Sequence, residues 1–405
     1  MRKLTVQLRL SPTQVIPIGQ LAEADRRIYF EYDAAFLNRG LHLSPFKWPL
    51  RPGLIEHVDL SFGPLPGLID DSLPDGWGLL LMDRLFRRRG LDPAAISPLE
   101  RLSYLGTRTM GALTYHPPAD VERGDQLIDL HEVGKNAQEI YSGDAVEVLP
   151  VLMRAGGSPG GARPKVLVGI KGEQILSGED DLPDGFEHWI VKFSAKVDAR
   201  DAGPIEFAYA QMARAAGIDM PETRLFKVGK NASYFGVRRF DRGPGNTRVH
   251  VHTFGNLIHA NFRIPSTDYA DLMKVTNAMT RNYQDLLRAF RRMVFNVAAH
   301  NRDDHAKNFA FVMNDTGEWS LSPAYDLCFA PGPGGEHTMT VAGEGRAPTR
   351  EHVLQLAKQF DIKSKDATGI IDDVKADVAR WSEFARPADC TRKTTHAIQS
   401  SIHPL

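Results

Sequence analysis

The stretch Asp-Asp-His-Ala-Lys-Asn at residues 303–308, followed by Tyr-Asp-Leu at 325–327, decides the fold class of this chain. An aspartate, four residues and an asparagine form the spacing of a protein-kinase catalytic loop. A second aspartate shortly downstream completes the set that holds nucleotide-bound magnesium. Asp303, Asn308 and Asp326 fit this set. Many surface loops contain the same spacing by chance, so the surrounding sequence decides its weight.

The residues before this motif predict a helix with one apolar face. Between residues 283 and 300, apolar side chains recur at three- and four-residue intervals, which is the helical period. Arg288, Arg291 and Arg292 fall on the other side, which predicts a solvated face. Asp303 is therefore expected to leave the end of a rigid, buried element.

The residues after the motif predict a hairpin. Residues 309–313 are typical of a strand, 314–317 of a turn, and 319–321 of the returning strand. This hairpin would bring residues 322–326 back beside the loop, so the second aspartate would lie near the first.

A glycine-rich segment at residues 156–165, Gly-Gly-Ser-Pro-Gly-Gly-Ala-Arg-Pro-Lys, leads into an apolar run at 166–168. Glycines let backbone N–H groups approach phosphate oxygens closely. No Gly-Lys-Ser/Thr opens a helix here, so the segment is not a Walker motif. Its composition is compatible with a phosphate cover and equally with a flexible linker.

A lysine stands further along, in a predicted strand at residues 188–194. Lys192 has apolar neighbours, and an ammonium in such surroundings costs free energy unless it finds a partner. The phosphates of ATP would serve, and so would Glu206, which opens an amphipathic segment at 206–216. The alternative is that Lys192 reaches solvent at a sheet edge.

Together these blocks resemble the HipA family, the serine/threonine-kinase toxins of bacterial toxin–antitoxin pairs. The resemblance covers nearly the whole chain in the family's order, and it implies an α+β, two-lobed protein-kinase-like fold. That fold has a strand-rich N-terminal subdomain and a mainly helical C-terminal lobe. The matching blocks are Asp303–Phe309, Leu321–Leu327, Arg239–Arg242, Ser158-x-x-Gly-Ala-x-x-Lys165, Leu73–Gly78 and Gly106–Leu113.

The resemblance implies a role for individual residues. Asp303 would act as the base toward the hydroxyl of a protein substrate, Asn308 and Asp326 would bind Mg²⁺, and Lys192 would pair with ATP phosphates. Ser158 takes the position of a serine that becomes autophosphorylated. The other residues expected at the nucleotide are Gly160, Gly161, Ala162, Lys165, Val237, Arg239, Phe240, His305 and Lys307.

The strand from Val237 to Phe240 would be the hinge whose backbone bonds adenine, and His305 is also expected to hydrogen-bond within the catalytic loop. Two departures from the family pattern bear on this site. Residues 163–164 are Arg-Pro where other members carry Gln-Glu, and Arg238 stands where a glutamate is common. The second departure affects side-chain contacts to the nucleoside and leaves the backbone bonds possible.

Composition predicts a cytoplasmic enzyme. The 405 residues, 42% of them hydrophobic, can bury large cores and indicate two or more domains. A net charge of −1 argues against direct, nonspecific nucleic-acid binding. Cys328 and Cys390 are the two cysteines and lack ligand spacing, which favours a reducing compartment. No stretch approaches the roughly 20 apolar residues that span a bilayer.

The chain is expected to divide into an N-terminal subdomain, a connector and a kinase domain. The tail from Thr391 is polar, which predicts a frayed end. The expected boundaries are 1–116 for the HipA N-terminal-like subdomain, 117–147 for the connector, and 148–405 for the HipA C-terminal-like kinase domain, with its nucleotide-binding part at 148–255 and its helical catalytic lobe at 256–405.

Three functions fit these features. The first is an ATP- and Mg²⁺-dependent kinase acting on a protein serine, with a HipB-like helix-turn-helix antitoxin as partner and DNA reached only through it. The family precedent for the protein substrate is an aminoacyl-tRNA synthetase. The second is a small-molecule phosphotransferase, which would share the base, the metal ligands and the lysine. The third is a non-catalytic protein that binds an antitoxin or regulates a partner.

Overall fold

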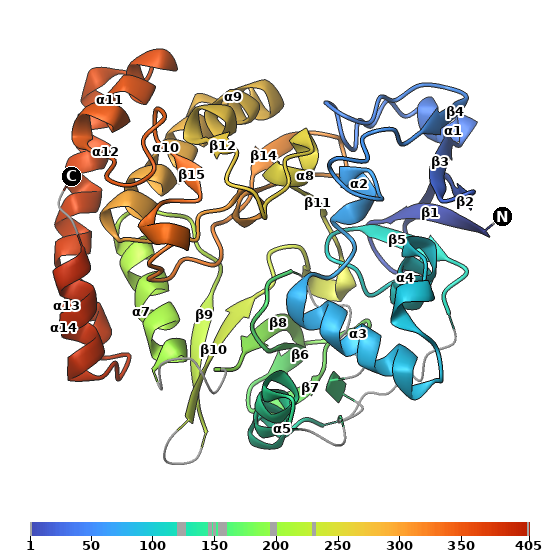
Figure 1. Ribbon diagram of the computed structural model, residues 1–405, viewed down its shortest axis with the longest axis horizontal. Coiled ribbons are helices and arrows are strands. Elements are labelled where there is room, and N and C mark those ends of the chain that lie inside the picture. The colour runs from blue at the N-terminus through green and yellow to red at the C-terminus, as the bar shows by residue number, and fades with distance from the viewer. Residues whose placement is uncertain are drawn as a thin grey trace.

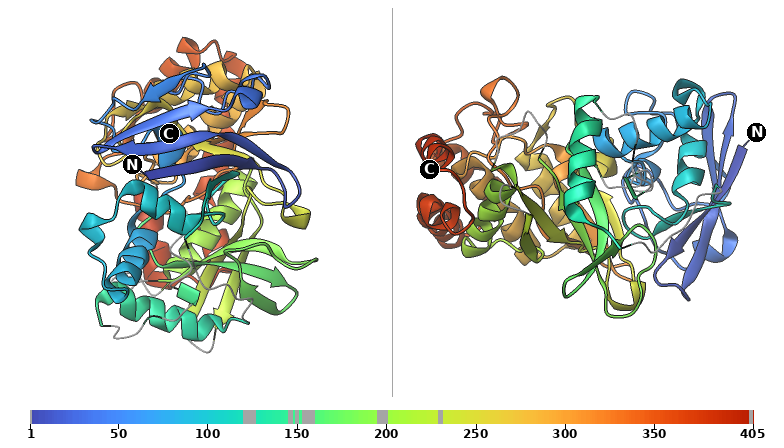
Figure 2. Two further views of the ribbon diagram at one scale, coloured as in Figure 1. Left: turned by 90° about the vertical axis from the view of Figure 1, so that its right-hand side faces the viewer. Right: turned by 90° about the horizontal axis from the view of Figure 1, so that it is seen from below.

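The computed structural model has two lobes with the N-terminal sheet at one end, and the two termini lie at opposite ends of the long axis (Figures 1 and 2). Ser158, the predicted modification site, lies outside the described residues. The structure describes residues 2–119, 127–144, 148, 151–152, 160–194, 201–228, 232–402 and 405.

The N-terminal unit (residues 2–116) is built on a five-stranded antiparallel sheet in the order β4-β3-β2-β1-β5. Apolar side chains alternate along β1, so one face of the sheet is buried. The unit is strand-rich, as predicted. Its elements are β1 Arg2–Arg9, β2 Val15–Ala24, β3 Arg27–Tyr32, α1 Ala34–Leu37, β4 Leu54–Glu56, α2 Gly67–Asp70, α3 Gly76–Arg88, α4 Pro98–Leu105 and β5 Leu113–His116.

A second five-stranded antiparallel sheet, in the order β7-β6-β8-β10-β9, forms the smaller lobe of the kinase-like part. Helices α3 and α5 share a buried cluster with one face of this sheet, and α7 shares another with residues of β10 (Figure 1). The elements are α5 Leu130–Ser142, β6 Lys165–Lys171, β7 Gln174–Ser177, β8 Glu187–Lys192, α7 Ala202–Ala215, β9 Thr223–Val228 and β10 Ala232–Arg238.

The larger lobe is mainly helical, around a core centred on α10 Tyr283–Ala298. All of the apolar positions predicted for the inner face of this helix are buried. The predicted hairpin is confirmed as antiparallel β13 and β14. The other elements are β11 His250–Thr253, α8 Phe254–Ile258, β12 Thr267–Asp268, α9 Tyr269–Thr280, β13 Ala310–Met313, β14 Trp319–Leu321, β15 Met339–Thr340, α11 Arg350–Gln359, α12 Ser364–Ala379, α13 Trp381–Ala385 and α14 Arg392–Ser401.

Two expectations about this lobe are wrong. Arg292 does not lie on a solvated face, because its side chain is buried and donates to the carbonyl of Ser322. That burial lowers the pKa of Arg292 to about 10. The tail is also not frayed over residues 392–401, where α14 forms. Thr391 caps this helix, and Ile398 is buried in the core of the lobe.

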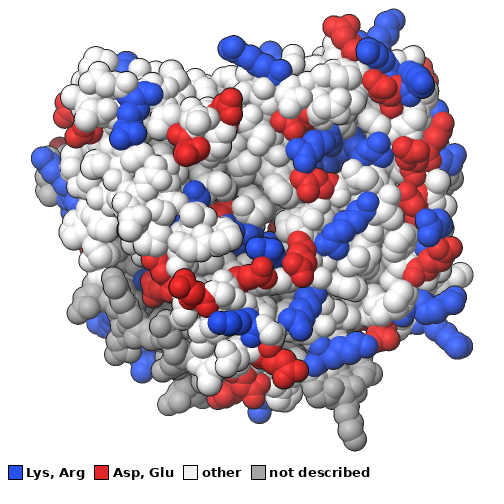
Figure 3. Space-filling view, turned by 180° about the vertical axis from the view of Figure 1, so that it is seen from behind, with Lys and Arg blue, Asp and Glu red and all other residues white. Residues whose placement is uncertain are grey.

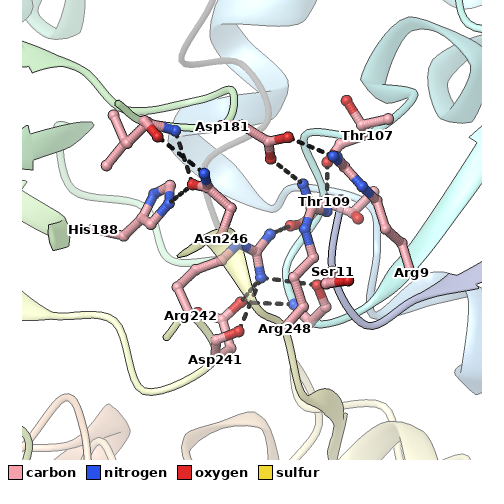
Figure 4. A network of polar contacts seen from close by, with 12 residues as sticks. Arg9, Ser11, Thr107, Thr109, Asp181, His188, Asp241, Arg242, Asn246 and Arg248 are labelled. Carbon is pink, nitrogen blue, oxygen red and sulfur yellow. Dashed lines mark hydrogen bonds and ion pairs between the residues drawn. The ribbon is translucent and has the colours of Figure 1, made fainter. Parts of the chain in front are cut away.

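A buried ion network joins the N-terminal unit to the smaller lobe (Figure 4). Asp181 pairs with Arg9 of β1, and its other oxygen lies 3.5 Å from Nη2 of Arg248. Arg248 also donates to the carbonyl of Thr107 at 2.8 Å. Because buried charges must be paired, these contacts fix the N-terminal sheet against the segment that follows β10.

The surface carries mixed charge. On the face shown in Figure 3, Lys and Arg side chains are interspersed with Asp and Glu, in keeping with the net charge of −1. Within the described ranges, no helix is long and apolar enough to cross a membrane.

Candidate functional site

Lys192, at the end of β8, is the centre of an ion cluster between the lobes. Its Nζ lies 2.5 Å from Oε1 of Glu206 in α7 and also bonds Asp326. Burial by itself would lower the pKa of Lys192, but the two carboxylates outweigh it and raise that pKa. Burial likewise favours protonated Asp326, yet the charges of Lys192 and Lys165 lower its pKa to about 2. Lys192 therefore has a helix glutamate as partner and does not reach solvent at a sheet edge.

Asp326 is held in an uncommon backbone conformation. Its φ is 53°, in the left-handed region, where aspartate is among the few side chains tolerated. The preceding Tyr325 donates its hydroxyl to the carbonyl of Lys307 at 2.7 Å, and its ring stacks on Phe240 at 5.8 Å between centroids. This anchoring aims the Asp326 carboxylate at Lys192, although 134 positions separate them in the chain.

The loop between α10 and β13 carries the predicted base and amide. Asn308 donates Nδ2 to the carbonyl of Asp303 at 2.7 Å, and its backbone N–H donates to the carbonyl of His305 at 2.8 Å. The first bond uses the amide nitrogen and leaves the side-chain oxygen as an acceptor. Asp303 is exposed as a residue, yet nearby protein partly desolvates its carboxylate, and this, with the charge of Asp326, raises its pKa.

Asp304, next to the predicted base, has a different environment. Its carboxylate is buried and accepts hydrogen bonds from the hydroxyl of Tyr269 at 2.7 Å and the backbone N–H of Thr338 at 2.9 Å. Nδ1 of His337 lies 2.8 Å from the same group. Asp304 thus anchors the loop to the core, and Asp303 is the carboxylate of this pair that faces outward.

The described part of the glycine-rich segment lies over the same cluster. Lys165 opens β6 directly opposite Lys192 in the sheet register, and its Nζ bonds the carbonyl of Gly160. Burial lowers the pKa of Lys165 to about 8. Gly161 has a φ of 99°, and a Cβ there would lie 2.6 Å from the Lys165 ammonium. The loop therefore needs glycine at this position to close over the lysine; Ala162 follows it directly.

The predicted hinge is only partly open to a ligand. Val237 lies within β10, and the backbone N–H groups of Arg238 and Arg239 already donate to the carbonyls of Glu222 and His188, each at 2.9 Å. These two amides are therefore not available to adenine in this conformation. The side chain of Arg238 pairs with Glu187 at 3.0 Å.

The side chain of Arg239 does not serve as predicted. Its guanidinium is buried and donates to both carboxylate oxygens of Asp241, at 2.9 and 2.7 Å. Arg242 binds the same carboxylate at 2.6 Å (Figure 4). It also donates to the carbonyl of Gly111 in the N-terminal unit at 2.9 Å. Arg239 is thus committed to a structural network, because a buried charge must keep its counter-charge.

The side chains of two other predicted site residues, His305 and Lys307, both lie close to the ring of Phe262. Nδ1 of His305 is buried without a hydrogen-bond partner among the described residues, and the ring lies 5.2 Å from that of Phe262. The hydrogen bond that His305 makes within the loop is the one that its backbone carbonyl accepts from the N–H of Asn308 at 2.8 Å. Nζ of Lys307 lies 3.3 Å from Oδ2 of both Asp70 and Asp75 in the N-terminal unit. Burial opposes the charged form, but these carboxylates raise the pKa of Lys307.

Sequence reasoning missed Asp70 and Asp75 as neighbours of the catalytic loop. From the sequence, Leu73–Gly78 is only a block that resembles the family. Its proline, aspartate and glycines predict a turn before a helix, and nothing in that pattern says which distant loop the turn will touch.

The two lobes, with the ion cluster and the Asp303–Asn308 loop between them, define a protein-kinase-like protein. Comparison with family models then identifies it more closely. The HipA-like C-terminal domain matches residues 157–382, and the HipA N-terminal domain matches residues 13–116. The chain belongs to the HipA family.

A solved structure has a similar fold. HipA of Shewanella oneidensis MR-1, solved in complex with HipB and its operator DNA, has 17% identity and a TM-score of 0.73 over 98% of this chain and 94% of its own. The proinflammatory kinase CtkA of Helicobacter pylori has 13% identity over 53% of this chain and 90% of its own, with a TM-score of 0.34, which is too low to support a shared arrangement.

A curated relative adds a sequence match. Y4dM of Sinorhizobium fredii, whose name describes it as a candidate kinase, is 27% identical over 211 residues. The match covers 48% of this chain and about half the length of that relative, 50%.

Proposed function

We propose that this chain is an ATP- and Mg²⁺-dependent serine/threonine-protein kinase, the toxin of a HipA-type toxin–antitoxin pair. The observation that carries the proposal is the ion cluster of Lys192, Glu206 and Asp326. It joins a strand lysine, a helix glutamate and a loop aspartate from three separate parts of the chain. Protein kinases need a lysine paired with a helix glutamate, and a carboxylate that holds magnesium, in place together.

The residues present fit a magnesium–nucleotide complex. Asp326 stays ionised at neutral pH, since its pKa is lowered to about 2, and its side chain is about a third exposed, 35%. The side-chain oxygen of Asn308 is available as a ligand, because the amide nitrogen makes the bond to the Asp303 carbonyl. Carboxylate and amide oxygens are the ligands that Mg²⁺ prefers, so these two residues would hold it. Lys192 and Lys165 would face the phosphates, beneath Gly160, Gly161 and Ala162. The bound metal would neutralise charge on the phosphate oxygens.

The catalytic loop would handle the proton of the substrate. Asp303 would accept the proton of a serine hydroxyl, and its outward carboxylate leaves room for a protein substrate. The bond from Asn308 to the Asp303 carbonyl would keep the base and the metal ligand at a fixed separation. Glu206 would orient Lys192 toward the nucleotide. Val237 and Phe240 would line the adenine side. Arg239, His305 and Lys307 would hold the protein around the site in place.

The partners follow from the family. The Shewanella relative was solved with HipB and operator DNA, which supports a HipB-like helix-turn-helix antitoxin here, with DNA contacted through it. The substrate would be a cytoplasmic protein serine, with an aminoacyl-tRNA synthetase as the family precedent, and modification would inhibit translation. Ser158 would be the autophosphorylation site that silences the enzyme.

Incubation with labelled ATP, Mg²⁺ and a cell lysate, followed by intact-mass and phosphopeptide analysis, tests this proposal. The wild type should gain one phosphate at Ser158 and label a protein serine. Asp303→Asn should lower transfer by about 10²–10⁴-fold, the usual contribution of a general base. Asp315→Asn, in the exposed hairpin turn, is the matched control and should act as wild type.

Label in a small molecule alone would support the phosphotransferase alternative. A folded wild type that transfers no phosphate at all would leave the non-catalytic alternative.

A further inference from the structure

A short turn of the N-terminal unit, Asp75-Gly76-Trp77 at the start of α3, contacts both the glycine-rich loop and the catalytic loop of the candidate site. We propose that this turn is a positioning element for phosphoryl transfer, which holds the glycine-rich loop and the catalytic loop at a fixed separation. The inference rests on the proposed function, and it assigns the N-terminal unit a part in the reaction.

The turn holds the glycine-rich loop by its backbone. Trp77 donates its backbone N–H to the carbonyl of Gly161 at 3.2 Å and its indole Nε1–H to the carbonyl of Lys165 at 2.8 Å. The first N–H groups of a helix lack partners within it, and here the loop supplies one. The indole is buried in the cluster that includes Val166 and Val191 of the kinase-like sheet, so Trp77 packs with that lobe.

The contact is close enough to exclude side chains. A Cβ on Gly76 would lie 2.6 Å from Cα of Ala162, and a Cβ on Gly160 would lie 2.9 Å from Oδ2 of Asp75. At Gly76 the backbone of the turn therefore meets the backbone of residues 161–162 directly, and at Gly160 the loop meets the side chain of Asp75. A displacement of the turn at Gly76 must displace residues 161–162, because no side chain lies between these two backbones to absorb it.

The same turn holds the catalytic loop by charge. Oδ2 of Asp75 lies 3.3 Å from Nζ of Lys307, and both side chains are largely buried, at 18% and 12% exposure. Asp75 makes no side-chain capping bond to α3, so its carboxylate is committed to this pair and to Arg263 at 3.8 Å. Lys307 directly precedes Asn308, so its anchoring sets where that amide points.

One rigid turn thus touches both halves of the site. Misplacement of a reacting group by about 1 Å costs on the order of 10²-fold in rate. A turn that fixes the two loops should therefore act on the rate of transfer. Nucleotide affinity should change less, because Lys192, the proposed phosphate partner, pairs with Glu206 and Asp326 and not with Asp75.

The test uses Asp75→Asn, which keeps the volume and removes the charge, in the full-length protein. Asp83→Asn is the matched control, because Asp83 lies on the same helix at similar exposure and pairs with Arg101, at 2.7 Å, away from the loops. Asp75→Asn should lower kcat roughly 10- to 100-fold with the KM for ATP little changed. Asp83→Asn should leave both constants unchanged.

A second readout does not depend on activity. Without nucleotide, backbone amide hydrogen exchange should become faster in Asp75→Asn for peptides covering both 160–165 and 303–309, and stay as in the wild type for Asp83→Asn. A double-mutant cycle with Lys307→Met should show that the two losses in kcat do not fully add, since both substitutions remove the Asp75–Lys307 pair, and Lys307→Met also removes the pair with Asp70.

Unchanged exchange in either loop, an unchanged kcat, or fully additive losses would each overturn the proposal. If the wild type transfers no phosphate, the proposed function fails and the kinetic role fails with it. The exchange measurement then still reports separately whether the turn holds the two loops.

Discussion

Asp241→Asn should destabilise the folded protein more than a surface charge change of the same chemistry. The carboxylate of Asp241 is fully buried, at 0% exposure. It accepts from Arg239 at 2.9 and 2.7 Å, from Arg242 at 2.6 Å, and from the backbone N–H of Gly111 at 2.8 Å. Burial opposes its ionisation, but the two arginines lower the pKa of Asp241 well below the usual range.

The loss in free energy of unfolding depends on the groups that Asp241→Asn would leave without a partner. Asparagine keeps the volume and one acceptor oxygen, but its NH₂ group would face guanidinium donors, and two buried positive charges would lose their counter-charge. Removing one partner of a buried ion pair costs about 3–5 kcal/mol. That is a large fraction of a typical free energy of unfolding of about 5–15 kcal/mol.

Urea unfolding followed by tryptophan fluorescence measures this free energy, with Asp219→Asn as the control. Asp219 pairs with Arg288 at 2.5 Å, but both side chains are more than 40% exposed, at 43% and 42%. Such surface pairs contribute about 0.2–1 kcal/mol. The urea midpoint should fall much further for Asp241→Asn, with the m value unchanged.

An Asp241→Asn variant that loses less than about 1 kcal/mol, or no more than Asp219→Asn, would show that the network does not join the N-terminal unit to the smaller lobe as argued.

Three further outcomes are expected. Lys192→Met should abolish the thermal stabilisation that ATP with Mg²⁺ gives the wild type. Lys171→Met, at an exposed position of β6, should keep it. Equal shifts of the melting temperature in the two variants would contradict the nucleotide site. Burial lowers the pKa of both His188 and His250 to about 4. The unfolded chain then binds more protons than the folded chain between about pH 6.5 and 4. The free energy of unfolding should therefore decrease as the pH is lowered through this range, by about 3 kcal/mol for each histidine at about pH 4. A flat urea midpoint over this range would refute the buried neutral form. Ile398→Ala should cost about 2–5 kcal/mol if α14 is packed as described, and a neutral change would mean that the tail is frayed after all.

Local pattern was enough to predict several elements. The helical period placed α10 and its buried face, and the alternation and turn residues placed the β13–β14 hairpin and β8. These features depend on neighbours a few positions apart, so the sequence carries them directly. The same holds for the spacing of Asp303 and Asn308, since a hydrogen bond between them closes within one short loop.

Side-chain environment was harder to predict. Arg292 has the charge of a solvated residue and lies on the polar side of its helix, yet the segment after β14 covers it. Arg239 belongs to a block shared with the family, and only packing shows that Asp241 binds its guanidinium. In the polar tail, α14 packs its buried isoleucine against the core of the larger lobe. The composition of the tail alone does not show that this surface exists.

What only the tertiary structure decided is the set of long-range contacts that make the site. Lys192 and Asp326 are 134 positions apart, and Asp75 and Lys307 are 232 positions apart. The sequence supplied the charges, and for Lys192 it offered Glu206 as one possible partner, because a buried ammonium needs a counter-charge. Which carboxylates meet which lysine depends on how two sheets and a helical core pack, and that packing is a property of the whole chain.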